Sequence, residues 1–501
     1  MNAKLIQLPL HKIDAFLNKP VKDFTRADLI RFIEAHNIEM VNFQYVGEDC
    51  RLKTLNFVIS GKAHLDHLLS YGERVDGSNL FSYVDAGSSD LYVIPRYCTA
   101  YVNPFSEIPT VNILCSYYTS EGERLQNAPE NIVRKAQQSL LNHTGLSLEA
   151  FGELEYYVIY EKQPLYPVLP QRGYEESSPF TKLEKLRCEA MRAIAQAGGT
   201  IKYGHTEVGS ISVNNLEMEQ HEIEFLPMPI EDAADQLVVA KWMLRMIGYK
   251  YGVTISFSPK IMVGHAGNGL HIHTKLVKDR NNVMVENGRL SNIAKKAIAG
   301  YLALAKSLTA FGNTIPVSYL RLVPNQEAPT NICWGDRNRS VLVRVPLGWI
   351  GVSNMIKDAN PLESANCEDN GEYQTVEFRS PDGSADIHLL LAGLAVSARH
   401  GLEMDNALNL SEEFYVPVNI FNDENKKLKE KFSHLPASCW ESADFLLKDR
   451  EIYQKDSVFT PVVIDGVVKK LKSYNDLGLS EKLYQKENEI QKLVTDYIHC
   501  A

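Results

Sequence analysis

Short apolar runs separated by polar turns fill the first 121 residues of the chain. A helix is predicted from Thr25 to about residue 36, because Thr25 is a good N-cap and Asp28 falls in the first turn. Strand-like runs rich in β-branched and aromatic residues then occur at 40–46, 55–59, 91–94 and 110–117. Gly, Asp, Ser and Asn separate these runs, as is typical of strands joined by turns. The pattern predicts a small β-rich domain over residues 1–121.

Longer helical patterns mark residues 122–501, which we expect to form one large domain with a helical C-terminal tail. Apolar residues at helical spacing predict helices at 129–142, 233–251, 291–311 and 385–401. Ser480 is predicted to cap a terminal helix. The stretch 209–218 shows neither period and is predicted to be irregular.

Four strand-like segments of this second region each carry polar residues on one face. Alternate residues of a strand share a face, so Glu153 is expected beside Glu155 and His271 beside His273. The same spacing recurs in Glu222 and Glu224 and in Glu377 and Arg379, and His205 and Glu207 show it just before the stretch predicted to be irregular. We therefore predict an α+β protein whose larger domain holds a curved antiparallel sheet, a half-barrel with a charged concave side, flanked by helices.

Neighbouring carboxylates on a core strand need an explanation, because they repel each other and are costly to bury. A solvated ladder of surface charges is one explanation. A bound divalent cation is another, since hard oxygen ligands suit magnesium or manganese. One Glu or His alone is weak evidence, but the repetition over four strands favours metal together with an anionic ligand.

Residues 321–344 combine four arginines with one acidic loop. Arg321 precedes a loop that contains Glu327 between two prolines, and Arg344 interrupts a valine-rich segment predicted as a strand over 340–346. Arg337 and Arg339 are two residues apart, so on an extended segment they would share a face. A buried arginine must be paired with an anion, and its planar fork suits carboxylate and phosphate. The alternative is a salt-bridge network without chemistry; the cluster favours a pocket for an anionic substrate and a transferring phosphoryl group.

Composition narrows the class of protein. The 501 residues are 45% hydrophobic and 23% charged, which is ordinary for a globular chain of two or more domains. The net charge of -10 argues against binding to nucleic acid or to an anionic membrane surface. Eight scattered cysteines include no Cys-x-x-Cys pair, so zinc and a disulfide framework are not expected. With no signal-peptide core and no bilayer-spanning apolar run, a cytoplasmic location is predicted.

Several stretches closely resemble the glutamine synthetase family, in a divergent form of the bacterial type I members. The resemblance rests on Arg-Leu-Val-Pro-Asn-Gln-Glu-Ala-Pro from residue 321, Arg-Asn-Arg-Ser from residue 337 and the Arg-Val-Pro exit at residue 344. Asp76-Gly-Ser-Asn, followed by Asp90, is similar to the family's N-terminal Asp-Gly-Ser-Ser loop. The resemblance implies a β-grasp-like N-terminal domain, a catalytic half-barrel domain and a ring-shaped, dodecamer-like homo-oligomer with active sites shared between subunits.

The resemblance also implies a role for each candidate residue. It places one metal on Glu155, Glu207 and Glu222, and a second on Glu153, His271 and Glu377. Glutamate is assigned to Arg321, Arg379 and Gly267, and the nucleotide to His273, Arg339, Arg344 and Tyr174. Asp76 and Glu327 are assigned to the ammonium ion. Arg339 and Arg344 also contact the transferring phosphate, so the implied catalytic residues are Asp76, Glu327, Arg339 and Arg344.

The implied reaction is ATP-dependent ligation of ammonia to the side-chain carboxylate of glutamate through γ-glutamyl phosphate, with two or more Mg²⁺ or Mn²⁺ ions per site. Two alternatives remain open: a γ-glutamyl ligase for a larger amine, and a non-catalytic sensor or structural protein. The chain departs from the family at Ala266, where an asparagine is usual, in a longer 208–221 segment, and in lacking a lysine before Glu377.

Overall fold

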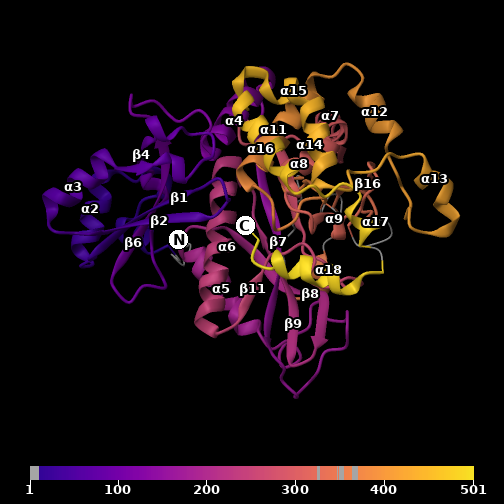
Figure 1. Cartoon of the computed structure of the whole chain (residues 1–501), viewed down its shortest axis with the longest axis horizontal. Helices are drawn as coiled ribbons and strands as arrows, with labels where there is room; N and C mark the ends of the chain where they lie inside the picture. Colours follow the sequence, from indigo (N-terminus) through magenta and orange to yellow (C-terminus); the bar gives the residue numbers. More distant parts are fainter. Residues whose placement is uncertain are drawn as a thin grey trace.

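The computed structural model describes residues 11–323, 328–346, 348, 355–363, 371–483 and 485–500. Its N-terminal part is a six-stranded sheet with strand order β2-β1-β6-β4-β3, with β5 pairing β6 (Figure 1). The strands are β1 (Met40–Val46), β2 (Leu52–Val58), β3 (Glu73–Asp76), β4 (Asp90–Pro95), β5 (Tyr101–Val102) and β6 (Thr110–Tyr118). Helices α1 (Lys12–Leu17), α2 (Arg26–Ala35) and α3 (Lys62–Tyr71) belong to the same part.

Local signals set the bounds of α2. The Thr25 side chain accepts a hydrogen bond from the backbone N–H of Asp28, and the Asp28 carboxylate accepts one from the backbone N–H of Thr25. This capping box satisfies donors that the first turn of a helix leaves free. The helix then buries Leu29, Phe32 and Ile33 against the sheet core.

The second part is built on a ten-stranded sheet with order β16-β17-β18-β12-β7-β9-β8. Strand β7 (Ser147–Glu161) lies at its centre, between β12 (Leu270–Lys278) and β9 (Leu216–Phe225), and pairs antiparallel with both. The other strands are β8 (Ile201–Val213), β10 (Met228–Pro229), β11 (Thr254–Ser256), β13 (Asn281–Asn282), β16 (Trp334–Asp336), β17 (Val343–Val345) and β18 (Val376–Phe378). The predicted α+β class with a curled half-barrel sheet is confirmed.

Helices cover the face of this sheet that is turned away from Glu153 and Glu155. A Cβ on Gly152 of β7 would meet Leu237 of α6, so α6 packs on the face opposite to that of Glu153. Helices α4 (Pro129–Thr144), α5 (Glu184–Gln196), α6 (Ile230–Tyr251) and α7 (Asn292–Ala303) contact strands of this sheet, and α8 (Ala305–Gly312), α9 (Ser318–Arg321) and α11 (Ile387–Glu403) belong to the same part. Later helices include α12 (Ala407–Glu413), α13 (Lys426–Glu430), α14 (Cys439–Lys448), α15 (Arg450–Gln454), α16 (Pro461–Ser473), α17 (Leu479–Lys482) and α18 (Glu487–Asp496). The polar face of the sheet is thereby left for a site.

The prediction of an irregular stretch at 209–218 is wrong. Residues 201–225 form one long β8–β9 hairpin, which projects at the lower edge of the molecule in Figure 1. Asn214 has φ +53°, a left-handed conformation that asparagine tolerates in a tight hairpin turn. Register shifts between Ile201 and Tyr203 and between Thr206 and Ser210 interrupt the alternation along β8. These irregularities hide the strand pattern in the sequence.

Three further expectations need correction. Arg337 has φ +55°, so it does not share an extended segment with Arg339, and the strand predicted over 340–346 covers Val343–Val345. The helix predicted over 291–311 is divided at Leu304 into α7 and α8. The predicted cap at Ser480 is also wrong, because the terminal helix α18 begins at Glu487.

The terminal helix packs on its own chain. Leu493 and Tyr497 of this region contact the cluster around Ile315 and Val317, just before α9. The following residues are fastened by three hydrogen bonds to carbonyl oxygens: Ser256 Oγ to Ile498 (2.6 Å), Arg245 to Cys500 (2.7 Å), and Arg51 to His499. Residues 498–500 therefore join the N-terminal part, through Arg51, to the ten-stranded sheet, through Ser256 of β11.

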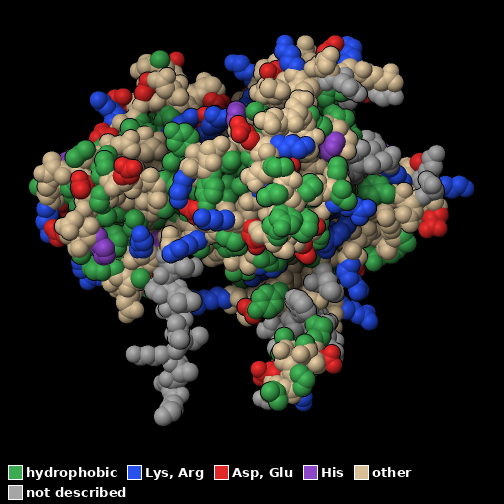
Figure 2. Space-filling model, turned by 90° about the horizontal axis from the view of Figure 1, so that it is seen from below, with side chains coloured by type: hydrophobic (Ala, Val, Ile, Leu, Met, Phe, Trp, Pro, Cys, Tyr) green, Lys and Arg blue, Asp and Glu red, His purple; other side chains and the backbone are tan. Residues whose placement is uncertain are grey.

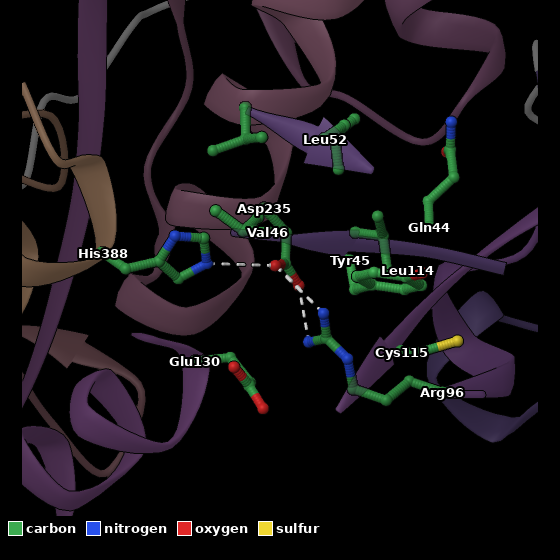
Figure 3. Close-up of a pocket in the computed structure, with 11 residues that line it drawn as sticks. Gln44, Tyr45, Val46, Leu52, Arg96, Leu114, Cys115, Glu130, Asp235 and His388 are labelled. Carbon is green, nitrogen blue, oxygen red and sulfur yellow. Dashed lines mark hydrogen bonds and ion pairs between the residues drawn. The ribbon is translucent and has the colours of Figure 1, made fainter. Parts of the chain in front are cut away.

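A buried ion pair links the two parts of the chain. Arg96, which follows β4, donates two hydrogen bonds to Asp235 of α6, at 2.6 and 3.1 Å, and His388 of α11 lies 3.4 Å from the same carboxylate (Figure 3). Burial raises the pKa of Asp235, but the neighbouring Arg96 outweighs this and lowers the pKa to about 2. The pair is therefore charged on both sides, and it ties the N-terminal sheet to the helical layer.

Surface charge is mixed on the face seen in Figure 2, where basic and acidic side chains are interspersed with apolar ones. Within the described ranges, we find no helix with the length and apolar character needed to cross a bilayer.

Candidate active site

A cleft of about 1280 Å³ opens over the polar face of the ten-stranded sheet. Strand register places its side chains in rows: Glu153 lies opposite His271 on one side and opposite Glu224 on the other. In the next row, Glu155 lies opposite Glu222, and Glu222 opposite His205. The predicted polar face of each strand thus contributes to one surface.

The predicted metal ligands come together in this cleft, in groupings that differ in part from the predicted ones. Candidate ligand atoms lie within 4.8 Å of one another in three overlapping groups. The groups are Glu153, His273 and Glu377; His205, Glu207 and Glu222; and Glu153, Glu222 and Glu224. Glu155 and His271 stand beside them, with His271 Nδ1 2.8 Å from Glu153 Oε2 and Nε2 3.7 Å from Glu155 Oε1.

Two members of these groups, His205 and Glu224, were not assigned a role from the sequence. His205 Nε2 lies 3.2 Å from Glu222 Oε1, and Glu224 is almost fully buried. Each stands two residues from an assigned ligand, Glu207 or Glu222, and so shares its face. That spacing was the signal that could have identified them.

The electrostatics of the wall fit a bound cation. Burial, and then repulsion by Glu153 and Glu155, raises the pKa of Glu222 well above its ordinary value. Glu153 is also buried, yet the adjacent His273 and His271 lower the pKa of Glu153. Burial opposes protonation of His273, but the Glu153 carboxylate raises the pKa of His273. Closely spaced, buried oxygen donors in mutual repulsion are the donor set that a hard divalent cation relieves.

Neighbouring groups orient the donors. Glu155 Oε2 accepts hydrogen bonds from the backbone N–H of Gly269 (2.8 Å) and from Gln220 Nε2 (2.9 Å). These bonds leave the other Glu155 oxygen toward the cleft side, 3.7 Å from His271. The carboxylate is held in one orientation, as metal ligands commonly are.

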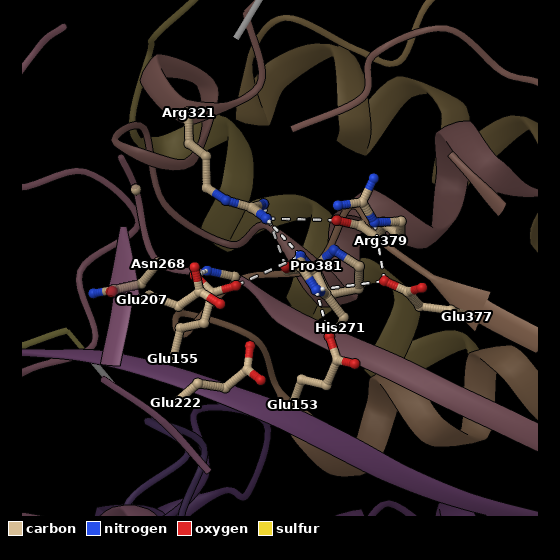
Figure 4. A network of polar contacts seen from close by, with 12 residues as sticks. Glu153, Glu155, Glu207, Glu222, Asn268, His271, Arg321, Glu377, Arg379 and Pro381 are labelled. Carbon is tan, nitrogen blue, oxygen red and sulfur yellow. Dashed lines mark hydrogen bonds and ion pairs between the residues drawn. The ribbon is translucent and has the colours of Figure 1, made fainter. Parts of the chain in front are cut away.

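Arginines form the opposite side of the network. Figure 4 shows Arg321 and Arg379 on one side, Glu153, Glu155 and Glu222 on the other, and His271 between them. Arg321 donates to the carbonyl oxygen of Ser380 at 2.9 Å, and its Nη2 lies 3.4 Å from His271 Nε2. Backbone and side-chain contacts therefore fix a cation beside the acidic wall.

Two arginines flank Glu377. Arg379 Nε donates to Glu377 Oε1 at 2.9 Å, and Arg344 Nη1 donates to Glu377 Oε2 at 2.8 Å. Arg379 also donates to the backbone oxygen of Arg339, whose own side chain is exposed and lines the cleft. Two of the predicted arginines thus hold one carboxylate, and the side chain of a third, Arg339, lines the same cleft, where an anionic ligand would meet positive charge.

Tyr174 and Gly267 also line the cleft. The Tyr174 ring lies 5.5 Å from that of His205 and is half-exposed. The backbone oxygen of Gly267 accepts a hydrogen bond from Gln220 at 3.0 Å, and a side chain at Gly267 would collide with the carbonyl oxygen of Pro259. Glycine is therefore required for this close approach of two backbone segments.

Of the two residues assigned to ammonium, Asp76 does not line the cleft of this chain. Glu327 lies outside the described residues. Asp76 lies at the end of β3, where its exposed carboxylate accepts hydrogen bonds from Ser78 and Asn79. Among the described residues, those that line the cleft begin at Phe151, so the N-terminal part contributes none of them.

Comparison with family models matches nearly the whole architecture. The model described as "Glutamine synthetase, catalytic domain" matches residues 126–474, and "Glutamine synthetase, beta-Grasp domain" matches residues 37–120. Relatives named glutamine synthetase include that of Mycolicibacterium smegmatis, 26% identical over 94% of this chain and 96% of its own. The Thermotoga maritima relative is 27% identical over 84% of this chain and 89% of its own.

Solved structures share the fold. The Plasmodium falciparum glutamine synthetase aligns with a TM-score of 0.75 at 20% identity, covering 93% of this chain and all (100%) of that one. A structure of GmaS without ligand aligns with a TM-score of 0.71 at 17% identity, covering 92% and 99%. The fold, the catalytic-domain match and the polar cleft agree: the chain belongs to the glutamine synthetase family.

Proposed function

We propose that this protein catalyses ATP-dependent ligation of ammonia to the side-chain carboxylate of glutamate, giving glutamine, ADP and phosphate. The observation that carries the proposal is the cleft itself, where acidic residues of β7 and β9 and the histidines of β12 face Arg321 and Arg379, and Arg344 lines the same cleft. An acidic wall is suited to divalent cations, and an arginine wall to carboxylate and phosphoryl groups. The family match supports the same reaction.

We assign the residues as follows. Arg321 and Arg379, with Gly267, would hold the glutamate substrate, and His273, Arg339, Arg344 and Tyr174 the nucleotide. Glu155, Glu207 and Glu222 would hold one divalent cation, Mg²⁺ or Mn²⁺, and Glu153, His271 and Glu377 another. When bound, these ions supply positive charge to the phosphate oxygens of ATP.

In the first step, an oxygen of the glutamate side chain attacks the γ-phosphorus of ATP in line, and the bond to the β-phosphate oxygen breaks. The products are ADP and γ-glutamyl phosphate. Arg339 and Arg344 would stabilise the charge that spreads over the transferring group, because their guanidinium forks match phosphoryl oxygens. Arg321 is already fixed by Ser380, so it would position substrate without reorganising.

In the second step, ammonia attacks the carbonyl carbon of γ-glutamyl phosphate, and inorganic phosphate leaves. Asp76 and Glu327 would bind ammonium and accept a proton on a carboxylate oxygen as the free amine forms. Because the cleft of one chain lacks Asp76, we propose that the Asp76 loop of a neighbouring subunit completes the site in a ring-shaped, dodecamer-like assembly.

A coupled assay of ADP release tests this function. We expect ATP turnover with glutamate and ammonium together, and its loss in excess chelator with recovery on adding Mg²⁺ or Mn²⁺. Full activity in excess chelator would contradict the metal assignment. A panel of ethanolamine and polyamines in place of ammonium decides the acceptor, since turnover with these amines alone would indicate a γ-glutamyl ligase for larger substrates. Absence of turnover with every acceptor would favour a non-catalytic protein.

A further inference from the structure

Lys202 enters the cleft through an irregularity in strand β8. Ile201 pairs with Phe225 and Tyr203 pairs with Glu224, so Lys202 is an extra residue with no partner of its own in the β8–β9 ladder. An extra residue of this kind is a β-bulge, which redirects side chains and is common beside active sites. As a result, Lys202 and Tyr203 both line the cleft, although adjacent strand residues ordinarily face opposite sides.

The ammonium group of Lys202 lies against the acidic wall. Its Nζ is 2.6 Å from Glu224 Oε1, and the Glu224 side chain is 3% exposed, while that of Lys202 is 42% exposed. Glu224 belongs, with Glu153 and Glu222, to one of the three sets of candidate metal ligands. The bulge therefore places a tethered cation at the edge of the cluster that we assign to metal binding.

Aromatic rings connect this cation to His273. Lys202 Nζ lies 5.0 Å from the Tyr203 ring centre and 6.0 Å from that of Phe151. The Phe151 ring stacks on His273 with centroids 4.5 Å apart and planes at 11°. The lysine thus stands on the side of the cleft that holds His273, which we assign to the nucleotide phosphates.

The position suits an anion. An ammonium group has three donors, and the contact with Glu224 uses one, so donors remain for a ligand in the cleft. The surrounding wall carries Glu153, Glu222 and Glu224, which would repel a polyphosphate unless positive charge were added. Lysine binds phosphate as a point charge and needs no fixed bidentate geometry.

Resting on the proposed function, we infer that Lys202 is a specificity-determining residue of the nucleotide site that neutralises Glu224 and donates to the phosphate groups of ATP. In this inference Lys202 contacts the phosphate groups of the nucleotide and does not contact the nucleoside. Removing the ammonium group of Lys202 should therefore weaken the binding of ligands that carry phosphate groups and leave the binding of adenosine unchanged.

The test compares binding of MgATP, MgADP and adenosine by calorimetry in Lys202→Met, Lys202→Arg and wild type. We expect Lys202→Met to lower the affinity for MgATP and MgADP about tenfold, which is the effect of losing one charge-assisted hydrogen bond. The affinity for adenosine should stay unchanged. Lys202→Arg keeps the charge and should stay within about threefold of wild type. Lys162→Met is the matched control: Lys162 directly follows β7, bonds Ser212 of β8 at 2.8 Å, and does not line the cleft.

Three outcomes overturn the inference. Unchanged binding of all three ligands in Lys202→Met would mean that the ammonium does not contact phosphate. An equal loss for all three, with a lower melting temperature, would mean that Lys202 only neutralises Glu224. A tenfold loss of affinity for MgATP and MgADP in Lys162→Met would mean that the net charge of the protein, and not a contact at Lys202, accounts for the weaker binding. Wild-type ligase activity is measured separately, so failure of the proposed function would appear there and not in these ratios.

Discussion

Replacing Asp235 by asparagine should destabilise the protein strongly, because it leaves Arg96 buried without its counter-ion. The two side chains are 11% and 23% exposed, so water replaces little of the lost contact. Removing one partner of a buried ion pair costs about 3–5 kcal/mol, and the partial exposure of Arg96 points to the lower end of that range. Arg96 Nε already has no hydrogen-bond partner among the described residues, which adds to the cost of losing the carboxylate.

The pKa of Asp235 gives an independent magnitude. A fall in the pKa of Asp235 from 3.8 to about 2 means that the ionised carboxylate adds about 2 kcal/mol to the free energy of unfolding. Because the folded pKa is the lower one, this stability is present above about pH 4 and is lost as the pH falls toward 2. Asp235→Asn should lack this part of the pH dependence.

A double-mutant cycle in urea measures the pair directly. We expect Asp235→Asn and Arg96→Met each to lower the free energy of unfolding by about 3 kcal/mol, and the double variant to cost about 2 kcal/mol less than the two together. Costs that add to within about 0.5 kcal/mol would show that the two residues are not coupled, and would refute the reasoning.

Three further predictions concern the site, the assembly and stability. Arg379→Lys should raise the KM for glutamate at least about tenfold with little change for ATP, because lysine cannot both hold Glu377 and present a planar fork; an unchanged KM would contradict the assignment. Asp76→Ala and Arg339→Ala should each be nearly inactive, but co-expression should restore part of the activity if sites are shared. Verified mixed oligomers without recovery would refute sharing. Gly466→Ala should add about 1 kcal/mol to the free energy of unfolding, since Gly466 lies within α16 and a Cβ there meets nothing within 4 Å; a lower urea midpoint would count against it.

The sequence predicted the parts of the fold in which local pattern and tertiary packing agree. The capped helix at Thr25, the strand 40–46 and the end of the helix predicted over 233–251 were found where local signals place them. The polar faces of β7, β9 and β12 also predicted one shared cleft. The domain boundary at residue 121 and the individual residue roles remain predictions.

Other features could not be read from one strand at a time. The β8–β9 hairpin was missed because bulges break its alternation, and Lys202 owes its place in the cleft to one of them. Spacing along the chain places His205 and Glu224 on a polar face, but only the strand register shows that His205 lies beside Glu222 and Glu224 beside Glu153. Metal groupings depend on distances across the sheet that residue spacing along the chain does not determine.

The fastening of residues 498–500 has a consequence for how the protein is made. Arg51 and its partner His499 are 448 positions apart, so a ribosome must synthesise the chain as far as His499 before this contact can form. Until then, Ile315 and Val317 lack the cover of Leu493 and Tyr497 and expose apolar surface. Nascent chains with such surface are prone to aggregate, and their protection falls to chaperones. Yield on expression should therefore depend on residues 493–500, which supply this cover and the three hydrogen bonds.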